Sequence, residues 1–560
     1  MKPGLPGFRP RLIESLRHYT RADFFADLSA GITVGVVALP LAMAFGIASG
    51  VKPDAGLFTA IIAGFLISAL GGSKVQIGGP AGAFVALLYT IVERYGLANL
   101  LIATMMAGVL LIAMGALRLG QLIRFIPISI ITGFTNGIAV IIGLAQLRDF
   151  LGLHIERMPA NLLSQIGVLW AARASLNWEA LVLAAASLAL IVVWPKTYLP
   201  EHARWRQWAA RVPGTVIVLA IGIIAVTLFG LSVDTIGSRF GGIASGLPSF
   251  ALPAFEWESV QKLFGPTVSI ALLCAIESLL CARVADSMID DRHDPNQELI
   301  AQGVANLVTP LFGGIAATGT IARTMTNVRS GARSPVAGII HAITLLAIVL
   351  VLAPLAQNIP MASLAAILLF VAWNMGEWSA FGKLGKFSIS YRTIMLATFV
   401  LTVIFDITVA IEVGLVLASL FFIHRISSLT RIEPIRLPAD IATLPDGTCT
   451  EAWRLFGSLF FGSVDKLEGL LDSKSKAAGA VVLEMHQVIN LDTSGLDALQ
   501  SLLTQLEKRG ATLIIAEPNE QPMSLLQRSG FLQEMGPHNV FEHLDDALAA
   551  LVSRHTPTHD

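Results

Sequence analysis

Two breaks rich in glycine, proline and threonine interrupt apolar stretches of the chain. The first reads Gly78-Gly79-Pro80-Ala81-Gly82, and the second reads Thr318-Gly319-Thr320-Ile321-Ala322-Arg323. The apolar stretches that follow, at about residues 80–92 and 320–331, are too short to cross a membrane alone. A helix that starts at such a break exposes unpaired N–H groups and the positive end of its dipole. Two such starts facing each other are predicted to bind an anion.

The residue types at the breaks fit that chemistry. Glycine lets a ligand approach the backbone, and Pro80 suits a first helical turn, where its missing N–H is not needed. Thr318 and Thr320 can add hydroxyl donors. The alternative interpretation is that both breaks are kinks in ordinary membrane helices.

Arg323 stands near the start of the second short helix, where its charge would add to that of the helix terminus. A cation at this depth costs about 2.5 to 3.5 kcal/mol on insertion scales, which favours a functional role. An interfacial anchor is the alternative. The candidate substrate-binding residues at the two breaks are Gly79, Pro80, Ala81, Gly82, Thr318, Gly319, Thr320, Ile321, Ala322 and Arg323.

Glu277 lies in the middle of another apolar stretch. A carboxylate inside the membrane is by default a functional candidate, and it can take up and release a proton. Glu277 is therefore the candidate coupling residue. The alternative is a structural carboxylate that is hydrogen-bonded to a helix break. Asp406 and Glu412 also have apolar neighbours, but they lie near a short turn between two spans.

The composition is that of a membrane protein. With glycine counted and tyrosine left out, about 62% of the 560 residues are apolar, against about 45–50% in soluble domains. Charged residues make up 14%, which excludes a disordered, nucleic-acid-binding or conventional soluble chain. Residues 431–560 carry 18 acidic and 10 basic residues, whereas the preceding residues carry 21 and 28. A membrane body followed by an acidic soluble tail is predicted.

Twelve apolar stretches are candidate spans, and the two short stretches raise the number of segments to fourteen. They form two runs of seven, in residues 24–232 and 258–430, with a short segment third in each run. Matched interruptions of this kind are typical of secondary transporters. Because seven is odd, the second run enters the membrane from the opposite side, and the repeats are inverted. The twelve spans are at about residues 27–48, 55–72, 97–117, 124–146, 177–195, 213–231, 265–283, 297–312, 335–356, 361–375, 392–406 and 408–424.

The basic residues between the segments predict the orientation. With the N-terminus inside, cytoplasmic connections hold fifteen lysines and arginines and external connections hold seven. Both termini are then cytoplasmic. Residues 1–21 have no apolar core of a signal peptide.

The tail is predicted to be a small α/β domain. Buried strands at residues 455–461, 480–485 and 512–516 alternate with helical patterns at 464–472, 495–508, 522–530 and 545–552. This alternation indicates a mostly parallel sheet. Asp492 is expected to cap a helix. The chain has no phosphate-binding Gly-x-x-x-x-Gly-Lys-Ser/Thr string, so ATP-driven transport is not expected. Neither an enzymatic activity nor a cofactor or metal is predicted.

Several of these strings resemble the SulP family of anion transporters, which includes prestin and pendrin. They are Asp27 to Gly35 with Pro40, Gly79-Pro80-Ala81, Gly313-Gly314-Ile315 and Arg323 to Asn327. The tail with Asp492-Thr493-Ser494-Gly495 resembles the STAS domain that ends such proteins. The resemblance covers about residues 23–551. It implies a cytoplasmic segment at 1–23, a transporter domain at 24–430, and a STAS domain with a short tail at 431–560.

The resemblance also implies an arrangement of the segments. Segments 1–4 and 8–11 would form a core that moves, like an elevator, against a gate of segments 5–7 and 12–14, in a homodimer. The substrate would lie between the third and tenth segments, lined by the first and eighth, which adds Pro40 to the site. Residues 276–281, 372–375 and 418–420 are most similar to a proton-linked branch that carries C4-dicarboxylates. Where the sodium-coupled bicarbonate branch has Asp and Thr, this chain has Glu277 and Cys281, and a thiol is a poor sodium ligand.

The sequence therefore predicts a secondary active anion transporter of the bacterial inner membrane. Its substrate would be a dicarboxylate such as succinate or fumarate, or a sulfate-type oxyanion, moved with a proton. One alternative is sodium-coupled transport of bicarbonate or sulfate. Another, from a different class, is a membrane-anchored regulator that acts through its STAS domain. The expected partners are the anion, the proton, the bilayer, a second copy of the chain and a possible cytoplasmic protein at the STAS domain, with no nucleic acid.

Overall fold

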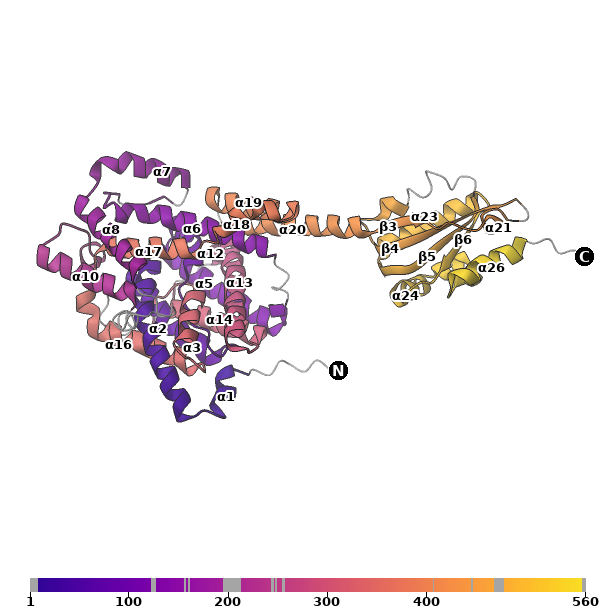
Figure 1. The fold of residues 1–560 in the computed structure, drawn as a ribbon. Helices are drawn as coiled ribbons and strands as arrows, with labels where there is room; N and C mark the ends of the chain where they lie inside the picture. The colour runs from indigo at the N-terminus through magenta and orange to yellow at the C-terminus, as the bar shows by residue number, and fades with distance from the viewer. Residues whose placement is uncertain are drawn as a thin grey trace, which may run out of the picture. The chain divides into compact units, whose positions relative to one another are not determined.

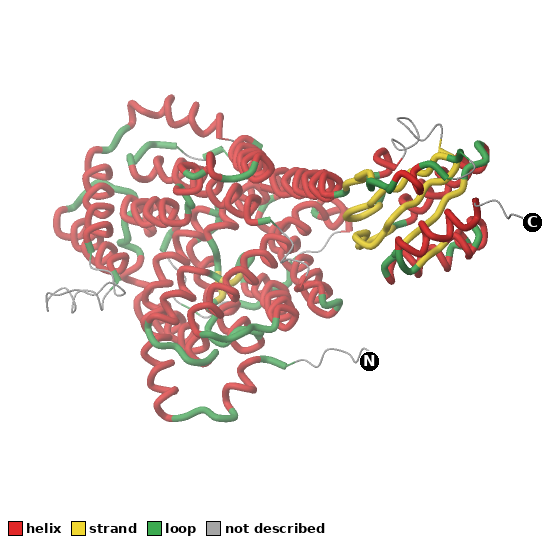
Figure 2. Tube along the Cα trace, turned by 45° about the vertical axis from the view of Figure 1, so that its right-hand side comes forward, coloured by secondary structure: helices red, strands yellow, loops and turns green. Residues whose placement is uncertain are grey.

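The computed structural model has two compact units, Met1–Leu415 and Val416–Asp560 (Figure 1). Helices build the first unit, and the second contains a sheet with helices (Figure 2). The structure describes residues 9–121, 127–155, 158–159, 162–194, 213–242, 246, 249–253, 257–405, 407–444, 447–467 and 478–555.

A helix occupies each of the fourteen predicted segments, which confirms the polytopic helical fold. In the described residues, seven helices are long and apolar enough to cross a membrane individually, or eight if α7 (Leu162–Ala171) and α8 (Trp178–Val193) count as one bent span. The helices of the first run are α2 (Arg21–Ala48), α3 (Pro53–Leu70), α4 (Val85–Tyr95), α5 (Leu97–Ala116), α6 (Ile128–Phe150), α8 (Trp178–Val193) and α10 (Gly214–Phe229). Those of the second run are α13 (Phe264–Ile289), α14 (Pro295–Val308), α15 (Ile321–Arg329), α16 (Val336–Ala356), α17 (Met361–Met375), α19 (Ile389–Ile404) and α20 (Ile407–Leu429).

The two short segments are half-helices, α4 with 11 residues and α15 with 9. The prediction that Pro80 lies in a first helical turn is wrong. Ala81 still has an extended backbone, and the first turn is the 3-10 helix η1 (Gly82–Phe84). The chain stays extended through this region because it has just left a strand that pairs with the other half of the unit.

Helix packing relates the two runs to each other. The first segment, α2, packs on α16, and the corresponding eighth segment, α13, packs on α5. Likewise α3 contacts α16 while α14 contacts α5, and α3 and α14 contact each other. Exchanging the two runs maps each of these pairs onto another pair or onto itself. This is the packing expected of two repeats of one helical unit.

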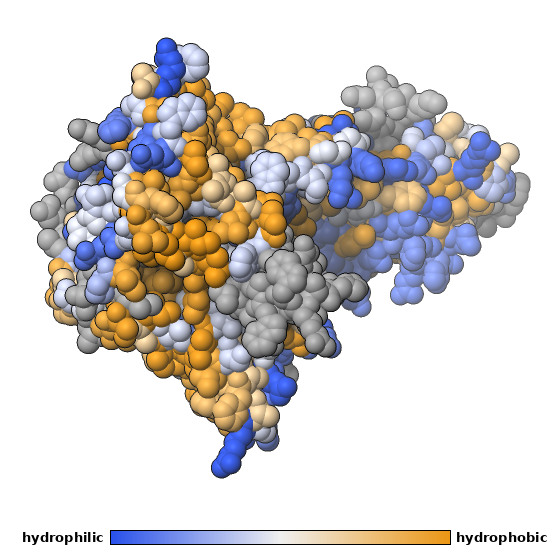
Figure 3. Space-filling view, turned by 60° about the vertical axis from the view of Figure 1, so that its left-hand side comes forward, coloured by the Kyte–Doolittle hydropathy of each residue, from blue (hydrophilic) through white to orange (hydrophobic). Residues whose placement is uncertain are grey.

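The surface of the first unit is apolar over large areas, as the orange regions of Figure 3 show. Val193 on α8, Leu228 on α10 and Val351 on α16 have 77%, 75% and 73% of their surface exposed. Contiguous exposed apolar surface is unfavourable in water. It suits a multi-pass protein whose solvent is lipid.

Asp27 fastens the start of α2 to the turn before α16. Its Oδ1 accepts the backbone N–H groups of Arg333 and Ser334, at 2.7 and 3.2 Å, and its Oδ2 accepts the hydroxyl of Ser334 at 2.5 Å. Tyr19 donates its hydroxyl to the same carboxylate at 2.9 Å. Burial and this hydrogen bond raise the pKa of Tyr19 above its usual range. The carboxylate of Asp27 thus has a structural role.

The second unit contains a five-stranded sheet in the order β3 (Arg431–Pro434), β4 (Cys449–Leu459), β5 (Ala478–Leu491), β6 (Thr512–Ala516) and β7 (Val540–Phe541). β3 is antiparallel to β4, and the other neighbours are parallel. The predicted mostly parallel sheet is therefore confirmed, with two edge strands that the sequence did not reveal. The helices are α21 (Ala439–Ala442), α23 (Thr493–Lys508), α24 (Glu520–Arg528), α25 (Phe531–Met535) and α26 (Leu544–His555).

Alternation along the central strands fills two cores. Leu483 and Ile515 pack on one face with residues of α23 and α24, whereas Val482 and Ile514 pack on the other with residues of α26. The period of two follows from the pleat of a strand. Asp492 accepts the N–H of Gly495 at 2.9 Å and caps α23 as predicted. The predicted helix at 464–472 lies partly outside the described residues.

Candidate functional site

The two breaks meet in an antiparallel pair of two-residue strands, β1 (Gly78–Gly79) and β2 (Thr318–Gly319), visible as short yellow segments among the helices in Figure 2. Gly78 pairs with Gly319, and Gly79 pairs with Thr318. η1 and α4 follow β1, and α15 follows β2. The structure therefore brings both sets of predicted residues to the place where β1 and β2 pair, which we call the crossing. Each half of the unit supplies one of its strands.

Two glycines of the crossing lie in close contact with polar side chains. A Cβ on Gly319 would lie 1.8 Å from Nε2 of Gln76, and a Cβ on Gly79 would lie 2.4 Å from Nη1 of Arg323. Neither position can hold a side chain unless these groups move. The space that the sequence assigned to a ligand at Gly79 and Gly319 is thus occupied here by protein side chains.

Side chains of α15 hold the strand that leads into β1. Ile77 donates its N–H to Oγ1 of Thr324 at 2.9 Å, and its carbonyl accepts the N–H of Thr320 at 2.9 Å. Asn327 donates from Nδ2 to the carbonyl of Val75 at 2.9 Å. These bonds span the two halves of the sequence, so the start of one half-helix positions the backbone before the other.

Arg323 is buried beneath the crossing, with 2% of its surface exposed. Its Nη2 donates to the carbonyl of Pro80 at 3.3 Å, and its Nη1 has no hydrogen-bond acceptor in the part of the chain that the structure describes. Within the described residues no carboxylate forms an ion pair with it. The guanidinium does not reach a surface as an anchor would, and it leaves a full positive charge beside both helix starts.

The hydroxyls of the two predicted threonines donate hydrogen bonds to backbone carbonyls. Thr318 donates from Oγ1 to the carbonyl of Cys274 at 3.1 Å, and Thr320 donates from Oγ1 to the carbonyl of Ile77 at 3.0 Å. Thr318 is fully buried, and Thr320 is 8% exposed. In this structure neither hydroxyl proton is free for a substrate, contrary to the expectation from the sequence.

One face of α13 lies against the crossing. Cys274, Glu277, Ser278 and Cys281 share that face, because their spacing is i, i+3, i+4 and i+7. Cys281 donates from Sγ to Oγ1 of Thr324 at 3.2 Å. Glu277 is half-buried, and its carboxylate has no hydrogen bond to any residue that the structure describes. The structural alternative for Glu277, a bond to a helix break, is therefore not found in this state.

The other candidate residues surround the same crossing. Ala81 is 8% exposed, Ile321 is half-buried and Ala322 is exposed. A Cβ on Gly82 would meet Met375 of α17 and Phe45 of α2, at 3.3 and 3.4 Å. The end of α17 thus lies close to η1, the turn before α4.

Pro40 interrupts the hydrogen-bond ladder of α2, which packs on both α4 and α15. Because proline has no N–H, the carbonyl of Val36 loses its helical partner. Pro40 itself is buried. Of the two further carboxylates, Glu412 is exposed on α20, and Asp406 lies outside the described residues.

Two polar side chains that hold the backbone before β2 in place were not predicted from the sequence. We call each of them a bracket. Asn306 on α14 exchanges two hydrogen bonds with the backbone of Ala317. Thr59 on α3 accepts the N–H of Ile315 at 2.7 Å, and its hydroxyl donates to the carbonyl of Ala55 at 2.6 Å. Asn306 continues a polar row with Glu298 and Gln302, four residues apart along α14. Three buried polar residues at this spacing in a membrane helix are a signal that could have indicated the bracket.

The chain matches two family models. The model of the sulfate permease family matches residues 24–398, and that of the STAS domain matches residues 452–547. A putative sulfate transporter, YvdB, of Bacillus subtilis is 42% identical over 94% of this chain and 98% of its own length. The bicarbonate transporter BicA of Synechocystis is 31% identical over 93% of both chains.

Solved structures agree with the fold. The transmembrane domain of a cyanobacterial bicarbonate transporter BicA is 33% identical, covers 70% of this chain and 98% of its own, and has a TM-score of 0.63. The structure of SLC26A9 covers 97% of this chain and 92% of its own, with a TM-score of 0.84. At 17% identity that second likeness shows the fold alone.

Proposed function

From the membership of this chain in the sulfate permease family, with its C-terminal STAS domain, we propose that it binds a small anion between the starts of α4 and α15 and carries it across the membrane. The family is one of transporters and not of enzymes. Secondary active transport is the proposed mode, and the bacterial inner membrane is the proposed location, with both termini in the cytoplasm.

The observation that carries this proposal is the buried charge of Arg323 at the place where two half-helices begin. Two helix N-termini supply partial positive charges, and backbone N–H groups there can bind an anion directly. The guanidinium, which no carboxylate of the described residues pairs with, adds a full charge in surroundings where electrostatic forces are weakly screened. A dehydrated anion would balance all three.

Sulfate is the first substrate to test, because the relative with 42% identity is named a putative sulfate transporter. Bicarbonate follows, because the Synechocystis relative is named a bicarbonate transporter. Succinate and fumarate belong in the same test, since a carboxylate presents a similar pair of charged oxygens. All four suit a site made of helix starts and one buried cation.

Protons are the proposed coupling ion, and Glu277 is the proposed carrier. Glu277 lies on the face of α13 that meets β2, and its carboxylate has no hydrogen bond to the described residues. Sodium is the alternative. It is less favoured because Cys281 offers a soft sulfur where a hard oxygen ligand would be needed.

The proposed movement is an elevator-like shift of α2–α5 and α13–α16 against α6–α10 and α17–α20. A homodimer is the proposed assembly. The STAS domain is the proposed contact for a cytoplasmic partner.

Uptake by proteoliposomes tests the function. Labelled sulfate, bicarbonate, succinate and fumarate are offered at two external pH values, with sodium and again with potassium as the only alkali cation. Accumulation of at least one anion, greater at the lower pH and equal with either cation, is expected. Uptake that requires sodium would replace the proton proposal. No uptake of any anion, together with a protein partner captured by the tail, would favour the regulator.

A further inference from the structure

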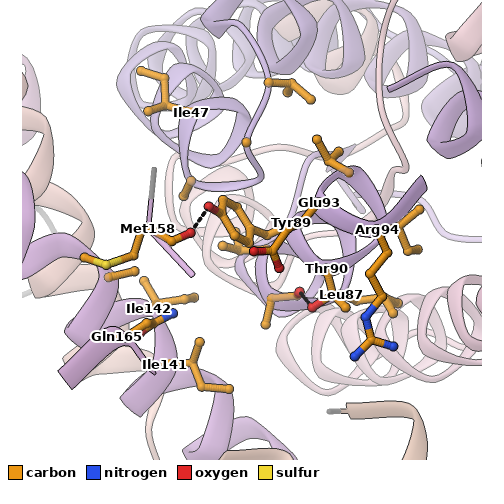
Figure 4. Close-up of a pocket in the computed structure, with 18 of the residues that line it drawn as sticks. Ile47, Leu87, Tyr89, Thr90, Glu93, Arg94, Ile141, Ile142, Met158 and Gln165 are labelled. Carbon is orange, nitrogen blue, oxygen red and sulfur yellow. Dashed lines mark hydrogen bonds between the residues drawn. The ribbon is translucent and has the colours of Figure 1, made fainter. Parts of the chain in front are cut away.

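A cavity of about 740 Å³ lies among helices of the first unit, and Figure 4 shows its lining. Its walls are the end of α2, the whole of α4, the last turns of α6, the end of α19 and the start of α13. All these helix ends belong to connections that the distribution of lysine and arginine assigns to the outside. Volumes of about 300–1,000 Å³ are typical of small-molecule sites.

The cavity runs along α4 toward the proposed anion site. Val85 and Ala86 in the first turn of α4 line it, and so do Arg94 and Tyr95 in the last turn. With 11 residues, α4 is about 16 Å long at 1.5 Å per residue. An anion that enters from the outside would therefore follow this helix to its start.

The proposed core and the proposed gate both line the cavity. α2, α4 and α13 belong to the proposed core, whereas α6 and α19 belong to the proposed gate. Tyr89 on α4 donates its hydroxyl to the carbonyl of Met158, which follows α6 (Figure 4). The cavity thus lies on the boundary that a transported anion has to enter.

The charges of the lining favour an anion. Arg94, Arg148 and Arg239 oppose Glu93 and Asp149, which leaves one net positive charge among the lining residues. Electrostatic potentials are concentrated in clefts of this kind and raise the local concentration of counter-ions. Asp234 also acts on Asp149 electrostatically, but it is not among the lining residues.

Two arginines share the single carboxylate of Asp149, and Arg148 is the more weakly held of them. Arg239 holds Asp149 directly, with 2.6 Å between Nη1 and Oδ1. Arg148 has only a longer contact of 3.6 Å, from Nε to the same oxygen, and this N–H has no hydrogen-bond acceptor in the described part of the chain. Gln146, 7% exposed, lines the same wall of α6. A buried N–H without an acceptor points to a ligand or water at this position.

We propose that Arg148 and Gln146 form an outer anion site, which takes the transported oxyanion or carboxylate from the external solution before it moves along α4 to the crossing. This site rests on the proposed function, since it supplies the same substrate. Its role is capture from one side of the membrane. It should therefore affect the concentration dependence of uptake, and not the maximal rate.

The test compares Arg148→Gln with Arg148→Lys and Arg173→Gln. Arg173 is a matched control because it lies in an external connection and stacks over Trp170, with 4.7 Å to the ring centroid, outside the cavity lining. With labelled sulfate offered from outside, R148Q is expected to raise KM about tenfold at low ionic strength with an unchanged maximal rate. R148K and R173Q should keep the wild-type KM.

Measuring KM from each side of the membrane separates a role of Arg148 in anion capture from a structural role. In inside-out vesicles, where sulfate meets the cytoplasmic face first, R148Q should have the wild-type KM. An equal increase from both sides, or the same KM for R148Q and R173Q from outside, would overturn the outer site. Failure of the wild-type protein to transport any of the four anions would instead overturn the proposed function.

Discussion

Asn306 and Ala317 are joined by a reciprocal pair of hydrogen bonds. The side-chain Nδ2 donates to the Ala317 carbonyl, and Oδ1 accepts the Ala317 N–H, each at 2.8 Å. A single amide side chain thereby replaces a neighbouring strand along one edge of the segment before β2. Since α15 begins just after β2, Asn306 determines the position of the helix start without facing it.

Replacing Asn306 with alanine is expected to weaken substrate binding and to destabilise the fold. The change leaves the buried N–H of Ala317 without its partner, at about 1–3 kcal/mol, and leaves the Ala317 carbonyl with only the weak thiol donor of Cys274 at 3.3 Å. Thermal unfolding in detergent should occur at a lower temperature, and KM for uptake should rise. Asn136→Ala is the control, because Asn136 is equally buried but donates within its own helix, to Thr132. Equal losses in both variants would show that the bracket has no special role.

Arg323→Ala should weaken anion uptake while the protein still folds. It removes the full charge at the crossing, and a hydrogen bond to a charged group is worth about 1.5–3 kcal/mol, so KM should rise roughly tenfold to a hundredfold. Direct binding of labelled sulfate to purified protein measures the effect. Arg333→Gln is the matched control, because Arg333 pairs with Asp23 and its side chain is 60% exposed. Unchanged affinity in well-folded Arg323→Ala would refute the role of the charge.

Glu277→Gln is expected to keep substrate binding and to lose coupling. Glutamine has nearly the volume of the protonated carboxyl but cannot release a proton. Wild-type uptake should increase as external pH falls, because protonation offsets part of the anion's charge as both cross the membrane. In the variant that increase and accumulation against a gradient should disappear. Glu412→Gln serves as the control, and a Glu277→Gln protein with wild-type pH dependence would rule out the coupling role.

Removal of the chain after Arg436 should lower expression or rate but leave anion affinity intact. All residues of the crossing precede Ser330, and the second unit begins at Val416. Sulfate binding to the purified truncation, compared with the full chain, provides the measurement. If a well-folded truncation bound no sulfate, the division between site and tail would be mistaken.

The matched breaks could be predicted because their cause is local. Glycine next to proline or threonine strongly disfavours a continuous helix, so Gly79-Pro80 and Thr318-Gly319 were enough to indicate two half-helices, whereas the isolated Pro40 stays within α2. The α/β tail was predictable for the same reason, since runs such as Thr512 to Ala516 match β6 residue for residue.

The sequence could not show which partner each buried polar group hydrogen-bonds. Thr59 and Ile315 are 256 residues apart, and no spacing rule connects them. The hydroxyl of Thr320 was expected to face a ligand, but it donates to Ile77 because the strands cross at that point. Such partners follow from which segments pack together, and they become visible only in the folded chain.

The crossing of β1 and β2 also constrains how the protein is made. Ile77 and Thr320 are 243 residues apart, and a ribosome adds about 5–20 residues per second, so the first break is synthesised roughly 12 to 50 seconds before its partner. During that interval the backbone of Ile77 lies at membrane depth without the bonds that later satisfy it, where each unsatisfied group is costly. The nascent first half therefore needs water or the insertion machinery beside it until Asn327 has emerged.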